Sequence, residues 1–540
     1  MFKSTSQKLT FFSISHSFQL HPCYTVPFRP VPFVINPAKN YRDHRTEIEL
    51  IDDLLTRSGL DDLVLKAVIE ERRRNTPEGQ DPDRGLEHFI THVRTGFRVG
   101  LLRAHLGTTA VRELEIKLAD SPLYQWFCFI DHFGGVKAPS KSTIDRYKNL
   151  FPDHVLEQAF QHLLRQAAEA PAHLDPDLEI LLNTLGFEIP SNLLEVWYDT
   201  TCLAPNIHFP VDWVQLADAS RTLLKAIRII RKHGLKNRLP QDPESFLSEL
   251  NQICINLGNA RRKVDSKKQR KKIFRLLKNF TDRIARHARK HRDLLEARRE
   301  SDTDLSAAQA QLVIDRIEHT LKLLPVLKKQ AHERIIGGRR FPTKDKILSN
   351  HEPDTKVIVR GKSEAEVEFG NPLLIGENRE GLITYWELFE DVRNDNKRLP
   401  AAIEKTEQTI GGLVELVCGD RGFSDEKMET DLEKSRPGLQ NHITPKNPVR
   451  LQDKFTDPAF AASQKRRAQT EARIGIITNN YQPGRSLSKG LASRRQELSW
   501  IMLAHNLRVL ARKRRREQTE RESRQKEERI ARKEPPRKAA

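Results

Sequence analysis

Three acidic residues in the 540-residue chain stand in patterns that could support metal-ion chemistry. The first, Asp420, follows the apolar run 413–418 and lies in Gly419-Asp420-Arg421-Gly422. A short run rich in Val and Leu predicts a buried strand. After it, we expect Gly419 to leave room beside the acid and Gly422 to adopt a backbone angle that other residues resist. Because open α/β sheets bind ligands beyond the carboxyl ends of their strands, Asp420 is a candidate ligand-binding carboxylate. The alternative is a turn in which this Asp caps the next helix.

The other two acids, Asp199 and Glu471, lie in a predicted strand and a predicted helix. Asp199 interrupts the apolar strand 193–201, where an ionised carboxylate is costly unless it is paired or metal-bound. Glu471 lies beside the packing face of helix 461–477, one turn after Arg467. The alternative for Glu471 is an ordinary ion pair with Arg467, at the i,i+4 spacing that is common on helices.

The order of the predicted elements brings these acids together. A strand with Asp199 precedes a hairpin pair, a helix, a strand that ends at Asp420 and a helix with Glu471, which matches an RNase H-like sheet. Three carboxylates brought close raise one another's pKa. Two divalent cations ~3.5–4 Å apart relieve that repulsion, activate the attacking oxygen and stabilise the leaving oxygen of an in-line displacement at phosphorus. Oxygen ligands of this kind favour Mg²⁺ or Mn²⁺. The sequence therefore predicts two ions per active site.

The elements around the acids follow from a change in hydrophobic periodicity after Asn350, from helical to alternating. Strands are expected at 356–360, 371–376, 382–389 and 442–444, a hairpin turn at 377–381, and helices at 399–410, 425–434 and 497–514. The fold class expected is therefore mixed α+β and α/β. It combines an RNase H-like mixed sheet and flanking helices with a helical N-terminal DNA-binding domain and a large helical insertion after the first strand.

The net charge of +19 predicts a polyanionic partner, with nucleic acid first and an anionic membrane surface second. No apolar segment approaches the ~20 residues that a membrane span needs. The apolar stretch 9–14 is interrupted by Ser and lacks a clear cleavage site, so no signal peptide is predicted. Five scattered cysteines show no metal-ligand spacing and fit a reducing cytosol. No G-x-x-x-x-G-K-[ST] occurs, so no nucleotide cofactor is expected.

Two basic regions are candidate DNA contacts. An aromatic helix from Leu123, a glycine turn and a short helix that opens at Ser142 resemble a helix-turn-helix, with Lys141 and Arg146 on the second helix. Its alternative is an ordinary pair of antiparallel helices. The second region is the run 261–292, which is almost entirely positive and is expected to contact phosphates rather than form a solvated face. Its candidate contacts are Lys268, Arg270, Lys271 and Lys272, and its expected buried stripe is Ile273, Leu276, Leu277, Phe280 and Ile284.

These patterns divide the chain into six expected regions. They are a poorly ordered leader at 1–44, a helix-turn-helix-like DNA-binding region at 45–150 and a helical linker at 151–190. The catalytic domain is expected at 191–202 plus 350–510, interrupted by a basic helical insertion at 203–349 for which Asp212 is the expected N-cap. A basic disordered tail is expected at 511–540, with a loose solvated helix as the alternative.

From about Asp120 to Leu510 the chain resembles the DDE transposases of bacterial insertion sequences, of the ISNCY-type group. The segments that carry the resemblance are Tyr198-Asp199-Thr200-Thr201, Asn206-Ile207-His208-Phe209-Pro210-Val211-Asp212, Glu366-Val367-Glu368-Phe369-Gly370, Cys418-Gly419-Asp420-Arg421-Gly422-Phe423, Glu471-Ala472-Arg473-Ile474-Gly475 and Ala504-His505-Asn506-Leu507. The resemblance implies metal ligation by Asp199, Asp420 and Glu471, and the cutting and joining of the element's ends.

The resemblance also implies partners and a location. The substrates would be double-stranded DNA, as inverted-repeat ends and as target, held by a homodimer or higher oligomer without a membrane. The protein would be cytoplasmic and associated with the nucleoid when bound to DNA. Arg421, Arg467 and Arg473 are expected to contact DNA near the acids.

One position departs from the family pattern. Related transposases carry an Arg before the Glu, which Arg467 matches, and a Lys seven positions after it, where this chain has Thr478. Arg473, Arg485 or Lys489 could replace that Lys. The alternative function is a catalytically decayed transposase that only binds DNA, and a third is a purely structural basic helical protein. His208 and His505 are expected to be turn or packing residues.

Overall fold

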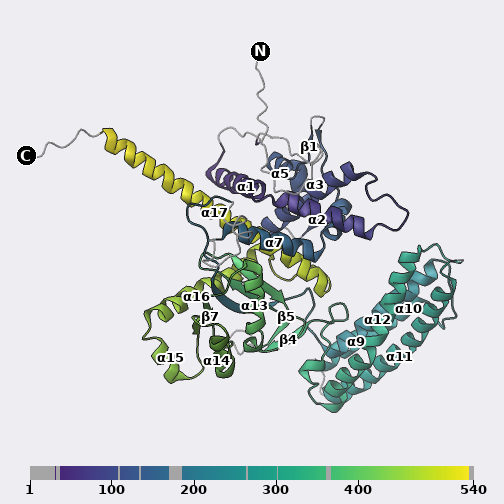
Figure 1. The fold of residues 1–540 in the computed structure, drawn as a ribbon. Helices are drawn as coiled ribbons and strands as arrows, with labels where there is room; N and C mark the ends of the chain where they lie inside the picture. The colour runs from purple at the N-terminus through teal and green to yellow at the C-terminus, as the bar shows by residue number, and fades with distance from the viewer. Residues whose placement is uncertain are drawn as a thin grey trace, which may run out of the picture. The chain divides into compact units, whose positions relative to one another are not determined.

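The computed structural model describes residues 31, 37–107, 110–132, 135–168, 185–262, 265–300, 302–359 and 367–533. The chain forms two compact units (Figure 1), Met1–Arg103 with Ala110–Ala159, and Ala104–Thr109 with Phe160–Ala540. Most of the expected leader and residues 169–184 of the expected linker lie outside the described residues.

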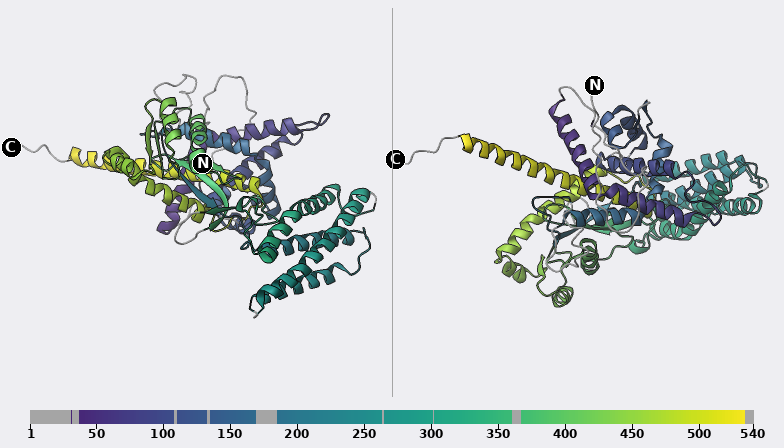
Figure 2. Two further views of the ribbon diagram at one scale, coloured as in Figure 1. Left: turned by 90° about the horizontal axis from the view of Figure 1, so that it is seen from below. Right: turned by 45° about the horizontal axis from the view of Figure 1, so that its top comes forward.

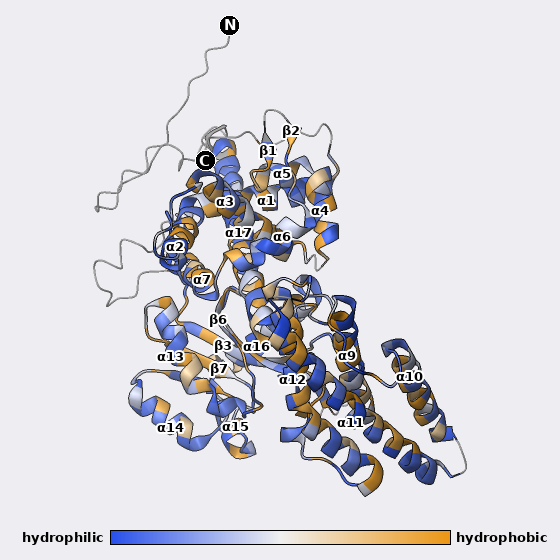
Figure 3. Ribbon diagram, turned by 90° about the vertical axis from the view of Figure 1, so that its right-hand side faces the viewer, coloured by the Kyte–Doolittle hydropathy of each residue, from blue (hydrophilic) through white to orange (hydrophobic). Residues whose placement is uncertain are grey.

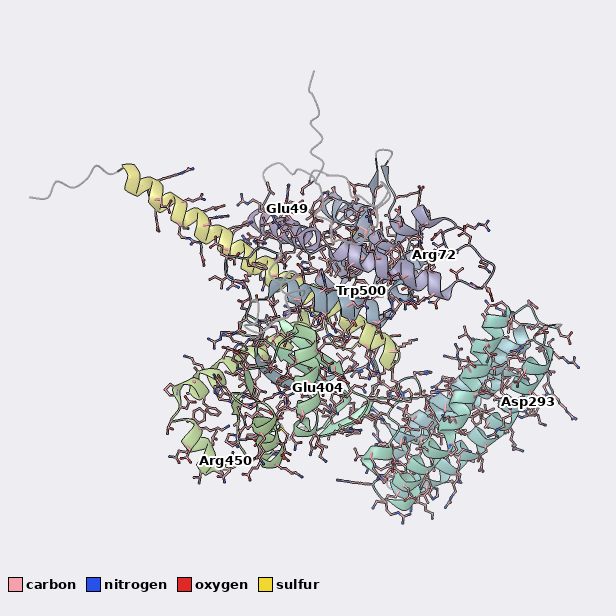
Figure 4. The ribbon with its side chains drawn as sticks, viewed as in Figure 1. Glu49, Arg72, Asp293, Glu404, Arg450 and Trp500 are labelled. Carbon is pink, nitrogen blue, oxygen red and sulfur yellow. The ribbon has the colours of Figure 1, made fainter. Side chains whose placement is uncertain are left out.

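The first unit is helical. Its helices are α1 (Lys39–Ser58), α2 (Leu60–Asn75), α3 (Leu86–His105), α4 (Val111–Asp120), α5 (Pro122–Phe127), α6 (Lys141–Tyr147) and the start of α7 (Asp153–Ala167). Because α1 begins at Lys39, the expected boundary at 45 was wrong by six residues. Arg98 is buried at the centre, where it pairs with Asp52 at 2.6 Å and Asp61 at 2.5 Å. At the edge of this unit, Arg72 (Figure 4) stacks on the Phe89 ring.

The connection between α5 and α6 differs from the expected glycine turn of a helix-turn-helix. It spans residues 128–140 and contains the two-stranded hairpin of β1 (Asp131–His132) and β2 (Gly135–Val136). Helix α6 begins at Lys141, because the Ser140 side chain accepts from the Thr143 backbone N–H; Ser142 is therefore not the cap. A compact helix-turn-helix has a turn of only three or four residues. Here the two helices are joined instead by a segment that contains a two-stranded β-hairpin.

The second unit contains one open mixed sheet. Its strands are β3 (Glu195–Leu203), β4 (Lys356–Val359), β5 (Val367–Glu377), β6 (Ile383–Leu388), β7 (Leu416–Gly419) and β8 (Gln440–Ile443). The order is β4-β5-β3-β7-β8, and β6 also pairs with β5. Pairing is antiparallel for β3–β5, β5–β6 and β4–β5, and parallel for β3–β7 and β7–β8. All the expected strands after Asn350 are present, and β5 begins earlier than expected.

Helices cover both faces of the sheet (Figure 1). Successive side chains of a strand point to opposite faces, and β3 shows this directly. Trp197 Nε1 donates to the Ser463 carbonyl of α16 (Pro458–Ile476) at 3.1 Å. The next residue, Tyr198, bonds through its hydroxyl to Thr406 of α13 (Leu399–Ile410) at 2.7 Å. Helices α14 (Glu426–Ser435) and α15 (Pro448–Lys454) flank β8 in sequence.

Four helices form the segment inserted between β3 and β4. They are α9 (Asp212–Lys232), α10 (Pro243–Asn259), α11 (Ser266–Arg298) and α12 (Ala307–His332), and they carry both hydrophobic and hydrophilic residues along their lengths (Figure 3). Their apolar sides share one core. Leu276 was wrongly placed in the buried stripe of α11: it is 53% exposed, and Phe274 is buried in its place. Asp212 is not the N-cap, which is Val211; Asp212 is the first helical residue and pairs with Lys346 at 3.2 Å.

The last helix, α17, runs from Leu491 to Lys533 as one continuous helix (Figure 2). Its expected inward residues, from Leu498 to Leu510, are buried. Asn506 ties it to the sheet because its side chain accepts from the Ile383 N–H and donates to the Ile383 carbonyl, both at 2.8 Å. Of the two expectations for the tail, disorder or a loose solvated helix, the structure shows a helix as far as Lys533. Arg514 and Glu517 pair at 4.0 Å on the half-buried side of this part, and beyond them exposed basic and acidic residues follow one another along the helix.

Candidate active site

The parallel pairing of β3 and β7 places Asp199 beside Asp420. Trp197 is opposite Cys418 in the ladder. Each acid lies two residues further along its own strand direction, so the two carboxylates leave the sheet at the same level. Both residues are half-buried. The strand β7 ends at Gly419, so Asp420 begins the turn at its carboxyl end, as the sequence predicted.

The turn after β7 needs both of its glycines for space. The Gly422 N–H donates to Asp420 Oδ1 at 2.8 Å, and a Cβ at Gly422 would lie 2.9 Å from that same oxygen. A Cβ at Gly419 would lie 2.9 Å from the Phe423 ring. Neither glycine has a positive φ, so the expected unusual backbone angle at Gly422 was wrong. The glycine is required because any side chain would displace the Asp420 carboxylate.

Glu471 lies on α16, which packs against β3 and β7. Its side chain is 60% exposed, and one of its oxygens accepts from Arg467 Nη1 at 3.1 Å. The i,i+4 ion pair weighed from the sequence is therefore present. It holds the glutamate on the helix surface, while Arg467 itself is half-buried.

The electrostatics of Asp199 show that all three acids are close enough to interact. Burial raises the pKa of Asp199 to about 6, and the charge of Asp420 is the next largest cause. The Glu471 charge raises this pKa further, whereas the Thr200 N–H and the Arg467 charge lower it. A carboxylate with a raised pKa among like charges is typical of functional sites.

The three acids do not form a closed ligand set around one point. In the described part of the chain, no three His, Cys, Asp or Glu side chains are arranged to hold one metal ion. Asp199 and Asp420 are neighbours with hard oxygen donors, which suits a divalent cation. Glu471 is directed to Arg467. The donor chemistry thus fits a divalent cation bound by the two aspartates. Glu471 would become a third ligand only if its carboxylate left Arg467 and bound the cation instead.

Sequence reasoning missed two acids near this site. Asp395, in the short 3₁₀ turn η6 (Asp395–Lys397), would be 3.4 Å from a Cβ at Gly422, so its carboxylate also lies near Asp420. Glu377, at the end of β5, is fully buried and accepts from Arg466 at 2.7 Å and from Arg473 at 2.9 Å. Nothing local marks Glu377, because it occupies a position predicted to be a hairpin turn.

The expected DNA contacts near the acids divide into two kinds. Arg421 is exposed beside Asp420 and is available to a ligand. Arg473 is not, because its guanidinium is only 17% exposed and is bound to Glu377. Thr478 lies in the π-helical turn η7 (Ile477–Tyr481), and its hydroxyl donates to the Ile474 carbonyl at 2.9 Å. Arg473 is therefore already paired, and Thr478 carries no charge, so neither residue can take the part of the family's Lys beside Glu471.

The remaining candidates lie elsewhere. Arg485 donates to the Ile207 carbonyl, and Lys489 is exposed. Lys141 and Arg146 are exposed on α6 of the first unit, and Lys268 and Lys272 are exposed on α11, while Arg270 and Lys271 are half-buried.

The two histidines take different roles. His208 is half exposed, and its Nε2 lies 2.9 Å from Asp218 Oδ2. His505 is buried, as expected, with its Nε2 at 3.1 Å from the Gly381 carbonyl.

Comparisons with protein-family models, with curated proteins and with solved structures found no match to this chain.

Proposed function

We propose that this protein is a DDE transposase that catalyses metal-dependent DNA strand cleavage and strand transfer at insertion-sequence ends. The observation that carries the proposal is the placement of Asp199 beside Asp420 by the parallel pairing of β3 and β7, with Glu471 on the helix that packs on both strands. These three acids come from a strand, a turn and a helix spread over almost three hundred residues. Placing mutually repelling carboxylates together costs stability, and such an arrangement is found chiefly at functional sites.

The sheet supports an RNase H-like catalytic domain. Leaving aside β4, the strands follow the order β6-β5-β3-β7-β8, with the first two pairings antiparallel and the last two parallel. The first acid is in the central strand, the second ends its parallel neighbour, and the third is on a helix that packs on both. This is the arrangement on which the sequence-based interpretation depends.

The reaction assigns separate tasks to the chain's own residues. Asp199 and Asp420 would hold Mg²⁺ or Mn²⁺, and bound cations would stabilise the negative charge that develops at phosphorus. Arg467 keeps Glu471 at the edge of this site. Arg421, exposed next to Asp420, can bind a DNA phosphate through its guanidinium. The phosphodiester would lie beside Asp420, at the carboxyl end of β7.

The inserted helices supply a second set of positive charges for DNA. Arg270 is half-buried at the start of α11, and its pKa is lowered by burial and then by the charges of Arg261 and Arg334. These arginines come from three segments, namely α11, the 3₁₀ turn η3 (Ala260–Arg262) and the π-helical turn η4 (Glu333–Gly337). Clustered like charges are unfavourable until phosphates neutralise them. Lys268, Arg270, Lys271 and Lys272 would contact DNA here, and Lys141 and Arg146 would do so from the first unit.

The proposal includes partners and a location. Double-stranded DNA ends and target DNA are the substrates, and two ends held together require a homodimer or higher oligomer. The protein would work in the bacterial cytoplasm on the nucleoid. No helix in the described ranges is long and apolar enough to cross a bilayer.

A second candidate is a decayed transposase that only binds DNA. It is favoured by Thr478, whose hydroxyl bonds to its own helix where the family pattern has a Lys, and by the contact of Glu471 with Arg467. This candidate keeps the DNA-binding surfaces and loses the reaction.

A cleavage assay separates the two functions. Purified protein is incubated with labelled DNA that carries the inverted repeats flanking the gene, with Mg²⁺ or with chelator. The transposase should nick this DNA only with Mg²⁺, and Asp420→Asn should bind it with unchanged affinity but not nick it. Mg²⁺-dependent nicking that persists in Asp199→Asn, Asp420→Asn and Glu471→Gln would show that the site is wrong. Binding without nicking by the wild type would favour the decayed protein.

A further inference from the structure

A second cleft in the larger unit has a positively charged lining. Its volume is about 610 Å³, and it lies between α17, α16 and the turn between β5 and β6. The lining residues are Glu380, Arg473, Val509, Arg512, Arg515, Arg516, Thr519 and Glu520. Neither Asp199 nor Asp420 lines it, so the cleft is separate from the candidate active site.

Two charged residues of the cleft lining, Glu380 and Arg473, already have partners of opposite charge within the fold. Glu380 accepts from Lys513 at 2.8 Å and from the Ser191 hydroxyl at 2.7 Å. Arg473 is fixed by the buried Glu377. The acid that faces the cleft from the β5–β6 turn is therefore already neutralised by a lysine of α17. Glu380 and Glu377 are thus occupied by their own cations, and Glu520 is the one other acid in a lining that carries four arginines.

Two of the arginines on α17 remain without a carboxylate. Among the described residues, no Asp or Glu lies within ion-pair distance of Arg512 or Arg516, and both side chains are exposed. They are four residues apart and so lie on the same side of the helix, about 6 Å apart along its axis. The positive field reaches inward: the pKa of the buried His505 falls to about 3, first because of burial and then because of Arg473, with Arg508 and Arg512 adding to it.

We propose that this cleft binds the sugar-phosphate backbone of a nucleic acid, with Arg512 and Arg516 as its phosphate contacts. Guanidinium groups match phosphate oxygens in two-pronged geometry. An acidic peptide is the competing ligand. Arginine clusters also recognise acidic motifs in peptides, but the net charge of +19 favours a polyanion such as nucleic acid as the partner. The inference relies on the proposed function only for the choice of nucleic acid as partner.

The test measures DNA binding without metal, so that it does not depend on cleavage. The affinities of wild type and Arg512→Ala/Arg516→Ala for a duplex of arbitrary sequence are measured with chelator at several salt concentrations. Each phosphate contact contributes about 0.9 to the slope of log affinity against log salt. Loss of both contacts should lower that slope by about 1.8 and the affinity at low salt by roughly tenfold or more.

The matched control is Lys526→Ala/Arg529→Ala, which removes the same charge from exposed positions further along α17. This control should change the salt slope by less than half of the change in Arg512→Ala/Arg516→Ala. Equal effects of the two double variants, or no effect of either, would overturn the inference, because the helix would then attract DNA only diffusely or not at all. Arg512→Lys/Arg516→Lys should keep most of the slope. If the cleft variant lost binding to poly-glutamate but kept DNA binding, the ligand would be an acidic protein instead.

The outcomes remain separate from those of the cleavage assay. If the Arg512→Ala/Arg516→Ala variant lowers the salt slope as expected but the wild type does not nick DNA with Mg²⁺, the cleft binds nucleic acid and the protein is not an active transposase. If the wild type nicks DNA but the double variant leaves the salt slope unchanged, the transposase proposal is supported and the proposal for the cleft is refuted. Thermal unfolding of all variants should match the wild type because the altered side chains are exposed.

Discussion

Two carboxylates on one face of the sheet, Glu377 and Asp199, have opposite surroundings. Glu377 lies opposite Trp197 in the antiparallel ladder, and Asp199 is two residues along the same strand, so both acids project toward α16. Glu377 is fully buried and binds two guanidinium groups from that helix. Asp199 is half-buried, and burial, followed by the charges of its acidic neighbours, raises its pKa.

The difference separates a carboxylate that two arginines neutralise within the fold from one that burial and acidic neighbours leave with a raised pKa. One helix supplies Arg466 and Arg473 to the first carboxylate and Glu471 to the second. Arg466 also donates to the Asn378 carbonyl at 2.6 Å and stacks on Trp197. Glu377 therefore fixes the helix that carries Glu471. Asp199 has only a backbone N–H and a more distant Arg467 in its favour, and it lies where a bound cation would provide the missing positive charge.

The largest expected effect is on catalysis. Asp420→Asn should reduce Mg²⁺-dependent nicking by about a thousandfold or more, because it removes a charged metal ligand from the reacting centre. Rates of nicking at saturating DNA measure this loss. Asp242→Asn is the control, since Asp242 caps α10 of the inserted helices through the Ser245 N–H and is exposed there. Comparable losses in both variants would remove the distinction on which the proposal depends.

The second effect is on stability. Glu377→Gln should destabilise the larger unit by about 3 kcal/mol, because it leaves two largely buried guanidinium groups without their carboxylate. Glu471→Gln should change stability by about 0.5 kcal/mol or less, since its pair with Arg467 is exposed. Denaturant unfolding of both variants provides the comparison. A larger loss in the Glu471 variant would reverse the assignment of the two acids.

The third effect depends on pH. The pKa of Asp199 in the folded protein, about 6, is above the ordinary Asp value. The folded state thus binds the proton more tightly, and this group's contribution to stability falls as the pH rises from about 4 to 6. With chelator present, Asp199→Asn should be more stable than wild type by about 3 kcal/mol above pH 7 and near equal to it at pH 4. A constant difference across this range would contradict the raised pKa.

The smallest effect concerns Arg467. Because its charge lowers the pKa of Asp199, Arg467→Met should move the midpoint of that pH dependence upward. The change in stability itself should be about 0.5 kcal/mol, as for an i,i+4 pair. The pH dependence of the melting temperature, measured with and without Asp199→Asn, gives the midpoint. An unchanged midpoint would mean that Arg467 acts only on Glu471.

Local patterns in the sequence predicted most of the elements that hold the acids. Helix α13 matches its expected bounds, and β7 ends where the glycines indicate. These elements have short-range signals, namely apolar runs and turn residues. The approach of Asp199 to Asp420 could be expected from the order of strands, because parallel neighbours end at the same edge.

The features that escaped prediction depend on contacts between distant segments. The role of Glu377 depends on two arginines about ninety positions away. Arg473 was expected to contact DNA, since an arginine in a sequence does not show which carboxylate it meets. The hairpin between α5 and α6 replaced an expected glycine turn, and the helical end of α17 replaced an expected disordered tail. The two-residue strands of the hairpin are too short to produce an alternating pattern, and the polar composition of the tail does not distinguish a solvated helix from a loop.

The most direct test of the central claim is a crystal structure of the protein soaked with Mn²⁺ and recorded at a wavelength where manganese scatters anomalously. We predict an anomalous peak between the Asp199 and Asp420 carboxylates, which disappears in Asp420→Asn. If no peak appears there at millimolar Mn²⁺ while Glu471 stays on Arg467, the acids do not form a metal site and the account is wrong.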